Sequence, residues 1–163
     1  MLRISKLADY GTIVMVYLAE HNDKLCSARD ISANTHISMP TVSKLLKHLT
    51  SAKLLTSVRG VSGGYLLQRD ARAISLADII YALDNTRGLT ECSHEPNDCT
   101  LQSVCHVKGN WRIISQMIND ALKSVSLEVF SNSSLNRDSQ NNSLLKLKFA
   151  IDSAINSKKK IEI

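Results

Sequence analysis

Apolar and polar positions in the first part of the chain recur with the period of an α-helix. This pattern predicts a helix over residues 7–18. A shorter helix is expected over residues 28–34, because Ser27 and Asp30 have the spacing of a capping box. A third helix is predicted from Met39 to about Ala52. Its apolar stripe consists of Val42, Leu45, Leu46 and Leu49.

The second and third predicted helices are joined by a tight turn that ends at Ser38. Ser38 is expected to be the N-cap of the third helix, and Pro40 in its first turn removes no helical hydrogen bond. The outer face of this helix is polar and basic. Two short helices with such an outer face on the second indicate a helix-turn-helix.

Two short strands are expected next, at Leu54–Val58 and Tyr65–Leu67, with the glycine-rich segment 59–64 between them. Glycines permit positive φ in a tight hairpin. A hairpin after a recognition helix is a wing, and Arg59 at its tip is expected to reach phosphate or the minor groove. A simple turn without a DNA contact is the alternative. A phosphate-binding nucleotide loop is rejected, because the Gly-Lys-Ser/Thr ending and a following helix are missing.

The predicted DNA contacts are side chains and glycines of the third helix and the wing. They are Ser38, Pro40, Thr41, Ser43, Lys44, Lys47, His48, Arg59, Gly60 and Gly63. Charge supports this surface, since residues 1–72 hold 10 Lys/Arg against 5 Asp/Glu, whereas residues 73–130 hold 4 against 7. No acidic residue occurs between Ile31 and Arg69. The distribution indicates a polyanion-binding module; a basic face that serves only solubility is the alternative.

The composition adds only limits on size and core type to this prediction. The 163 residues fit one compact domain with appendages or two very small domains, and with 44% hydrophobic but only 4% aromatic residues the core must be aliphatic. Neither a membrane span nor an export signal is evident, so we expect a cytoplasmic protein with reduced cysteines.

The middle of the chain holds a cluster of cysteines. A capped helix is predicted from about Ile74 to Leu83, followed by a loop that lasts to about Lys108. The loop contains Cys92, Cys99 and Cys105. A loop of this length in a small domain is usually functional, and three thiols in it suggest a metal centre.

The cysteine spacing, C-x6-C-x5-C, is longer than the pairs that zinc modules use and suits a larger iron–sulfur cluster. Three cysteines leave one ligand missing. His106, His94, a carboxylate or a group from another chain could supply it. Three unrelated buried thiols are the alternative. Cys26, near a helix start, is expected to be structural.

A long amphipathic helix is predicted from an N-cap at Asn110 to about Val129. We expect it to pack against a second copy, because helix-turn-helix proteins bind paired half-sites as dimers; packing on its own core is the alternative. The expected division is therefore a winged helix-turn-helix domain (1–72), a cluster loop with a dimerisation helix (73–130), and a low-complexity tail (131–163) with a weak helix over 144–155.

These segments together resemble the Rrf-two (Rrf2) family of bacterial winged-helix regulators, over about residues 1–130. The resemblance rests on Met1–Tyr10, Val58–Leu67, Ile74–Ile80 and the cysteine loop that ends in Gly109–Arg112. Leu89-Thr90-Glu91-Cys92 and Gly109-Asn110-Trp111-Arg112 look most like the branch that regulates the SUF system of iron–sulfur assembly.

The resemblance implies a mainly α, winged-helix homodimer that binds a double-stranded DNA operator and carries an iron–sulfur cluster (2Fe-2S or 4Fe-4S). It implies a repressor of iron–sulfur assembly genes; a nitric oxide or redox sensor, or a zinc-bound or purely structural loop, is the alternative. An enzyme is not expected. In nitric-oxide-sensing relatives an aspartate of the partner's first helix is the fourth ligand, and Asp9 aligns with it. In an assembly regulator a histidine serves, but Lys108 occupies that position here, which leaves His106 as second choice. Ser43 replaces a recognition-helix glutamate of that relative.

Overall fold

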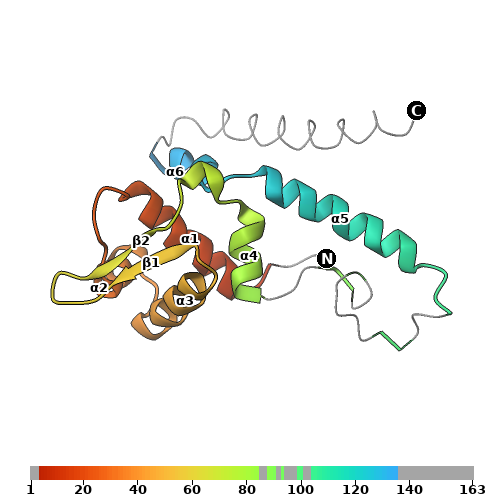
Figure 1. The fold of residues 1–163 in the computed structure, drawn as a ribbon, viewed down its shortest axis with the longest axis horizontal. Coiled ribbons are helices and arrows are strands. Elements are labelled where there is room, and N and C mark those ends of the chain that lie inside the picture. Colours follow the sequence, from red (N-terminus) through yellow and green to blue (C-terminus); the bar gives the residue numbers. More distant parts are fainter. Residues whose placement is uncertain (1–3, 85–87, 91–92, 94–98, 101–103, 136–163) are drawn as a thin grey trace.

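The fold is mainly helical with one two-stranded sheet, as predicted (Figure 1). The computed structural model describes residues 4–84, 88–90, 93, 99–100 and 104–135. The elements, in chain order, are α1 (Lys6–Glu20), α2 (Ala28–Thr35), α3 (Met39–Ser51), β1 (Leu55–Val58), β2 (Gly64–Leu67), the 3-10 helix η1 (Ala71–Ala73), α4 (Leu76–Asp84), α5 (Lys108–Ser124) and α6 (Leu127–Leu135). The helices and strands predicted for residues 7–83 are confirmed within a few residues at each end.

Hydrogen bonds of side chains to the backbone fix three of the helix starts. Ser27 and Asp30 form the predicted capping box of α2, and the hydrogen bonds from Ser27 lower the pKa of Asp30. Ser75 and Asp78 form the same reciprocal pair before α4, at 3.0 and 3.1 Å. Ser5 caps α1 by accepting a hydrogen bond from the backbone N–H of Ala8.

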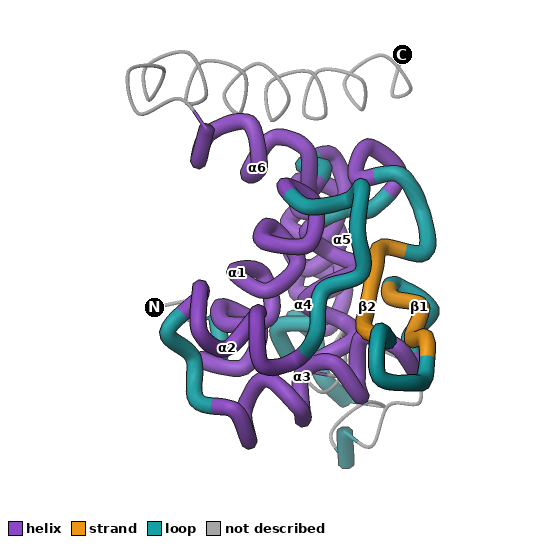
Figure 2. Tube along the Cα trace, turned by 90° about the vertical axis from the view of Figure 1, so that its left-hand side faces the viewer, coloured by secondary structure: helices purple, strands orange, loops and turns teal. Residues whose placement is uncertain are grey.

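Helices α1 to α4 surround an aliphatic core, with the hairpin at one edge (Figure 2). The core residues without exposed surface include Val14, Met15, Ile31, Val42, Leu45, Leu46 and Leu49. Gly11 of α1 lies against α4, where a Cβ would come within 2.0 Å of Leu83 Cδ1 and within 3.5 Å of Leu45 Cδ2 of α3. A glycine at this position therefore allows three helices to approach closely.

The hairpin is antiparallel and pairs Leu55 with Leu67 and Val58 with Gly64. Cys26 adds an isolated bridge to Tyr65, through hydrogen bonds of 3.1 and 2.9 Å between their backbones. Cys26 is buried, which confirms its predicted structural role, and burial raises the pKa of its thiol.

The C-terminal helical region differs from the prediction. Helix α5 begins at Lys108 after Val107, so the predicted N-cap at Asn110 is wrong. It ends at Ser124, because the backbone of residues 125–127 pairs with residues 74–76 and breaks the predicted continuous helix. The N–H of Leu76 donates to Val125 O and the N–H of Leu127 donates to Ile74 O, both at 2.8 Å.

Helix α6 then runs through Leu135 and contacts α1, so the boundary predicted before residue 131 falls inside a helix. Ser131 is buried and donates a hydrogen bond to Glu128 O. The helix expected over 144–155 lies outside the described residues. Across the described ranges, none of the helices has the length and apolar character required to cross a bilayer.

Candidate nucleic-acid interface and cysteine loop

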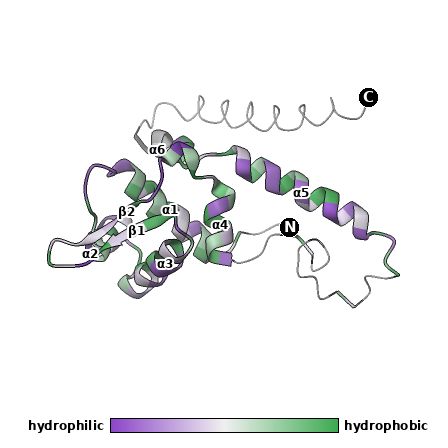
Figure 3. Ribbon diagram, viewed as in Figure 1, coloured by the Kyte–Doolittle hydropathy of each residue, from purple (hydrophilic) through white to green (hydrophobic). Residues whose placement is uncertain are grey.

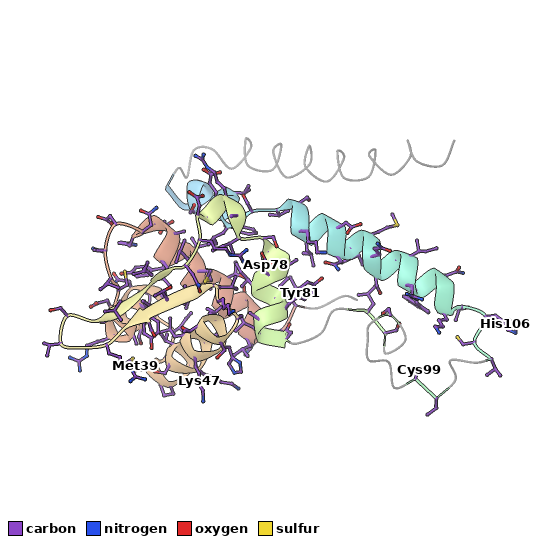
Figure 4. The ribbon with its side chains drawn as sticks, viewed as in Figure 1. Met39, Lys47, Asp78, Tyr81, Cys99 and His106 are labelled. Atoms are coloured by element: carbon purple, nitrogen blue, oxygen red, sulfur yellow. The ribbon has the colours of Figure 1, made fainter. Side chains whose placement is uncertain are left out.

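Helix α3 separates a buried face from an exposed, basic one. Its apolar stripe is buried in the core, as predicted. The opposite face exposes Ser43, Lys44, Lys47 and His48 to solvent. Lys47 lies at the outer edge of the molecule in Figure 4, together with Met39 at the start of the helix. Helix α3 therefore has the exposure expected of a recognition helix.

The first turn of α3 lacks the side-chain cap that the sequence predicts. Ser38 is the N-cap residue, but its hydroxyl is 2.9 Å from the Thr41 hydroxyl and accepts no backbone N–H. Ser38 and Pro40 are exposed and Thr41 is half-buried. All three predicted contacts thus lie on the accessible side of the helix start.

The wing follows α3 directly. Arg59 is exposed at the hairpin tip, and Gly60 has a φ of 125°, a conformation that favours glycine. A Cβ on Gly63 would lie 2.2 Å from Val58 O, and its N–H donates to Gly60 O at 3.0 Å. The two glycines therefore have a turn-forming role that explains them without a DNA contact.

The ion pairs set the α3 and wing cations apart from other basic residues. In the part of the chain that the structure describes, the two ion pairs are Arg69–Asp78 at 3.6 Å and Arg72–Glu128 at 2.9 Å. Lys44, Lys47 and Arg59 belong to neither. Their charges remain available to a polyanion, whereas those of Arg69 and Arg72 face carboxylates of the acidic middle region.

Cys99 and His106 lie near the N-terminal end of α5, on the side of the molecule away from the wing (Figure 4). Cys99 and Cys105 are half-buried free thiols and His106 is exposed. Cys92 and His94 lie outside the described residues. Among the residues that are described, no three His, Cys, Asp or Glu side chains come together as a group able to hold a metal ion.

The beginning of the cysteine loop is hydrogen-bonded to Ser115 of α5, a residue that was not predicted to have a role. The buried hydroxyl of Ser115 accepts a hydrogen bond of 3.1 Å from the N–H of Leu89. Ser93 holds the next turn by accepting from the N–H of Thr90 at 3.0 Å. A serine amid the polar residues of an amphipathic helix gives no sequence signal for such a role.

Asp9 lies in the first turn of α1. It is exposed and lines a cavity of about 430 Å³ between α1, α4 and α6. Lys6, Thr12, Leu76, Ile80 and Phe130 are among the other lining residues. Among the described residues of one subunit, Asp9, Cys99 and Cys105 do not form a group able to hold a metal ion.

A helix-turn-helix with an exposed basic recognition helix and a hairpin wing defines a winged-helix DNA-binding protein. Comparison with known proteins specifies it further. The profile of the Rrf2 family, described as an iron-dependent transcriptional regulator, matches residues 4–133, so the chain belongs to the Rrf2 family. It is a transcriptional regulator of the type that binds DNA, not an enzyme.

Individual relatives agree with this assignment. The chain is 33% identical to the HTH-type transcriptional regulator IscR of Photorhabdus laumondii over 80% of both chains. The structure of IscR from T. potens superposes with a TM-score of 0.60 at 28% identity, covering 85% of this chain and 91% of that one. CymR, the global cysteine regulator of B. subtilis, gives a TM-score of 0.64 at 27% identity, covering 81% and 98%.

Proposed function

We propose that this protein represses iron–sulfur assembly genes and senses cluster status through an iron–sulfur cluster of its own. The observation that carries the proposal is the position of three cysteines in one loop between α4 and α5. Two of them, Cys99 and Cys105, are free thiols in the structure. The similarity to IscR and the resemblance to the SUF branch support the choice of target genes.

The donor set fits an iron–sulfur cluster. Cys92, Cys99 and Cys105 would supply three thiolates, with the partner subunit's Asp9 as first choice for the fourth ligand and His106 as second. The partner's Asp9 is the first choice because it aligns with the aspartate that serves as fourth ligand, from the partner's first helix, in the nitric-oxide-sensing relatives. When bound, such a cluster supplies one-electron redox chemistry and sensitivity to oxygen.

The helix that precedes the loop, α4, contacts the DNA-binding elements. Asp84, the last residue of α4, accepts a hydrogen bond from the Ser5 hydroxyl, which also caps α1. Leu83 beside it packs against Gly11 of α1, which in turn lies next to Leu45 of α3. A shift of the loop that moved the end of α4 would thus reach the recognition helix through packed elements.

The proposed active form is a cytoplasmic homodimer on a double-stranded operator. Helix α5 extends away from the body of the molecule and shows hydrophobic positions along its length (Figure 3). Trp111, Ile114 and Met117 recur at intervals of three and are at least 40% exposed. An apolar stripe of this kind on one chain supports packing against a second copy.

The test is an anaerobic preparation of the full chain. We expect visible absorption, iron and acid-labile sulfide in the wild type, and their loss in Cys92→Ala, Cys99→Ala and Cys105→Ala. Asp9→Ala should change the visible circular dichroism or speed cluster loss in oxygen, and His106→Ala serves as its comparison. Operator affinity is then measured before and after cluster removal.

The outcomes separate the alternatives. A colourless protein that contains zinc would show that the loop holds a structural metal and not a cluster. A full cluster in any cysteine variant would refute the ligand set. An intact cluster in Asp9→Ala with loss in His106→Ala would reverse the ranking of the fourth ligand. Cluster loss caused by nitric oxide, with no response to cluster supply, would favour the nitric oxide sensor.

A further inference from the structure

The recognition helix begins with an exposed apolar surface. Within α3, which is described throughout, Met39 is the one large apolar side chain that is exposed, at 43%. Pro40, next to it, is also exposed. Figure 4 shows Met39 at the same outer edge as Lys47, so both lie on the side that α3 presents to a partner. Met39 was not among the contacts that the sequence predicted.

The chemistry of this first turn restricts what it can read in the major groove. Adenine and guanine are read by bidentate amide or guanidinium groups, and cytosine by a carboxylate. None of these groups occurs between Ser38 and Ser43. The hydroxyls of Ser38 and Thr41 already face each other at 2.9 Å, and Pro40 has no N–H to donate.

The remaining base feature that suits an apolar side chain is the 5-methyl group of thymine. Residues at the N-terminal end of a recognition helix are the ones that approach base edges. We propose that Met39 determines specificity by packing on the methyl group of a thymine in each half-site. The hydroxyl of Ser43 and the ammonium groups of Lys44 and Lys47 lie farther along α3 and contact neighbouring bases or phosphates.

This inference rests on the DNA-binding function, and its test measures DNA binding without reference to the cluster. An operator is first selected from randomised duplexes with the wild-type protein. Each thymine of a half-site is then replaced singly by deoxyuridine, which removes only the methyl group. We expect about fourfold weaker binding at one position per half-site, the factor for losing burial of one methyl group worth about 0.8 kcal/mol.

The decisive comparison is the coupling between protein and base. In Met39→Ala the deoxyuridine substitution should have no further effect, whereas Met39→Leu should keep the discrimination. Leu25→Ala, which shortens an exposed apolar side chain outside α3, should also keep it. Circular dichroism checks that each variant is folded.

Two results would overturn the proposal, and both differ from failure of the DNA-binding function. One is a half-site in which no thymine is sensitive to loss of its methyl group. The other is Met39→Ala with undiminished discrimination between thymine and deoxyuridine. Failure to select any sequence from the pool would instead refute specific DNA binding itself.

Discussion

Gly64, the first residue of β2, lies against the backbone of Cys26. A Cβ on Gly64 would be 2.7 Å from the carbonyl oxygen and 2.9 Å from the carbonyl carbon of Cys26. Backbone atoms cannot move aside as a side chain does. We expect Gly64→Ala to reduce the free energy of unfolding by about 1–3 kcal/mol, the usual cost of overpacking, measured by chemical denaturation.

Gly109 in the first turn of α5 is the matched control. A Cβ there would meet no atom within 4 Å. Gly109→Ala should therefore be neutral or stabilise by up to about 1 kcal/mol, the difference in helix propensity. Equal stability of the two variants would mean that β2 does not need its close approach to Cys26.

At the residue scale, the sequence predicts best what is decided locally. The capping boxes of Ser27 and Ser75 are confirmed because both partners lie within three residues of each other. Ser38 was predicted as an N-cap without a carboxylate three residues later, and its hydroxyl contacts that of Thr41 instead of a backbone N–H. Met39 was missed because the predicted contacts were drawn from polar and basic residues, proline and glycine, and its exposure is visible only in the structure.

At the scale of elements, α3 and the wing should act on phosphates through separate cations. We expect Lys47→Ala and Arg59→Ala each to weaken binding to all DNA sequences by a similar factor. Each should also flatten the slope of log K against log salt concentration by about one for every phosphate that the variant no longer neutralises. Titrations at several salt concentrations measure both effects.

Arg72→Ala is the control for these substitutions, because the Arg72 guanidinium is already paired with Glu128 at 2.9 Å. Its slope should match that of the wild type. If both Lys47→Ala and Arg59→Ala leave the slope unchanged, the proposed surface does not contact phosphates.

The hairpin and the first four helices could be predicted because each has its own periodicity and boundary residues. The break between α5 and α6 could not. It is imposed by pairing of residues 125–127 with residues 74–76, some fifty positions earlier in the chain. Residues 114–129 have a continuous helical pattern, so the local signal and the tertiary contact disagree and the contact prevails.

For the whole molecule, the proposed dimer depends on the apolar face of α5. Ile114 is 42% exposed near its centre. Ile114→Glu would place a charge in the subunit interface, so we expect the variant to be monomeric at concentrations at which the wild type is dimeric. Sedimentation velocity measures the change.

Gln116→Glu is the matched control, since Gln116 is an exposed polar residue of the same helix about half a turn away. It should remain dimeric. A dimer that survives Ile114→Glu would place the interface elsewhere on the molecule.

The candidate site was predictable to different degrees. The exposed basic face of α3 was predicted, because the periodicity of a single helix is enough to define it. The exposed apolar side chain of Met39 was not predicted. The proposed ligand set combines a loop with the first helix of the partner subunit, and the described residues of one chain contain no group of three metal-binding side chains. Periodicity gives no information about such a pairing, so Asp9 was suggested only by the family resemblance and stays a prediction.

The contact between α1 and α6 has a consequence for synthesis of the protein. Leu127, at the start of α6, is 1% exposed and belongs to the same core as Val14 and Leu45. The DNA-binding elements end at Leu67, yet their core is completed only when residues some sixty positions later have emerged from the ribosome. The nascent chain therefore cannot complete the core behind the DNA-binding elements before the cysteine loop has been translated.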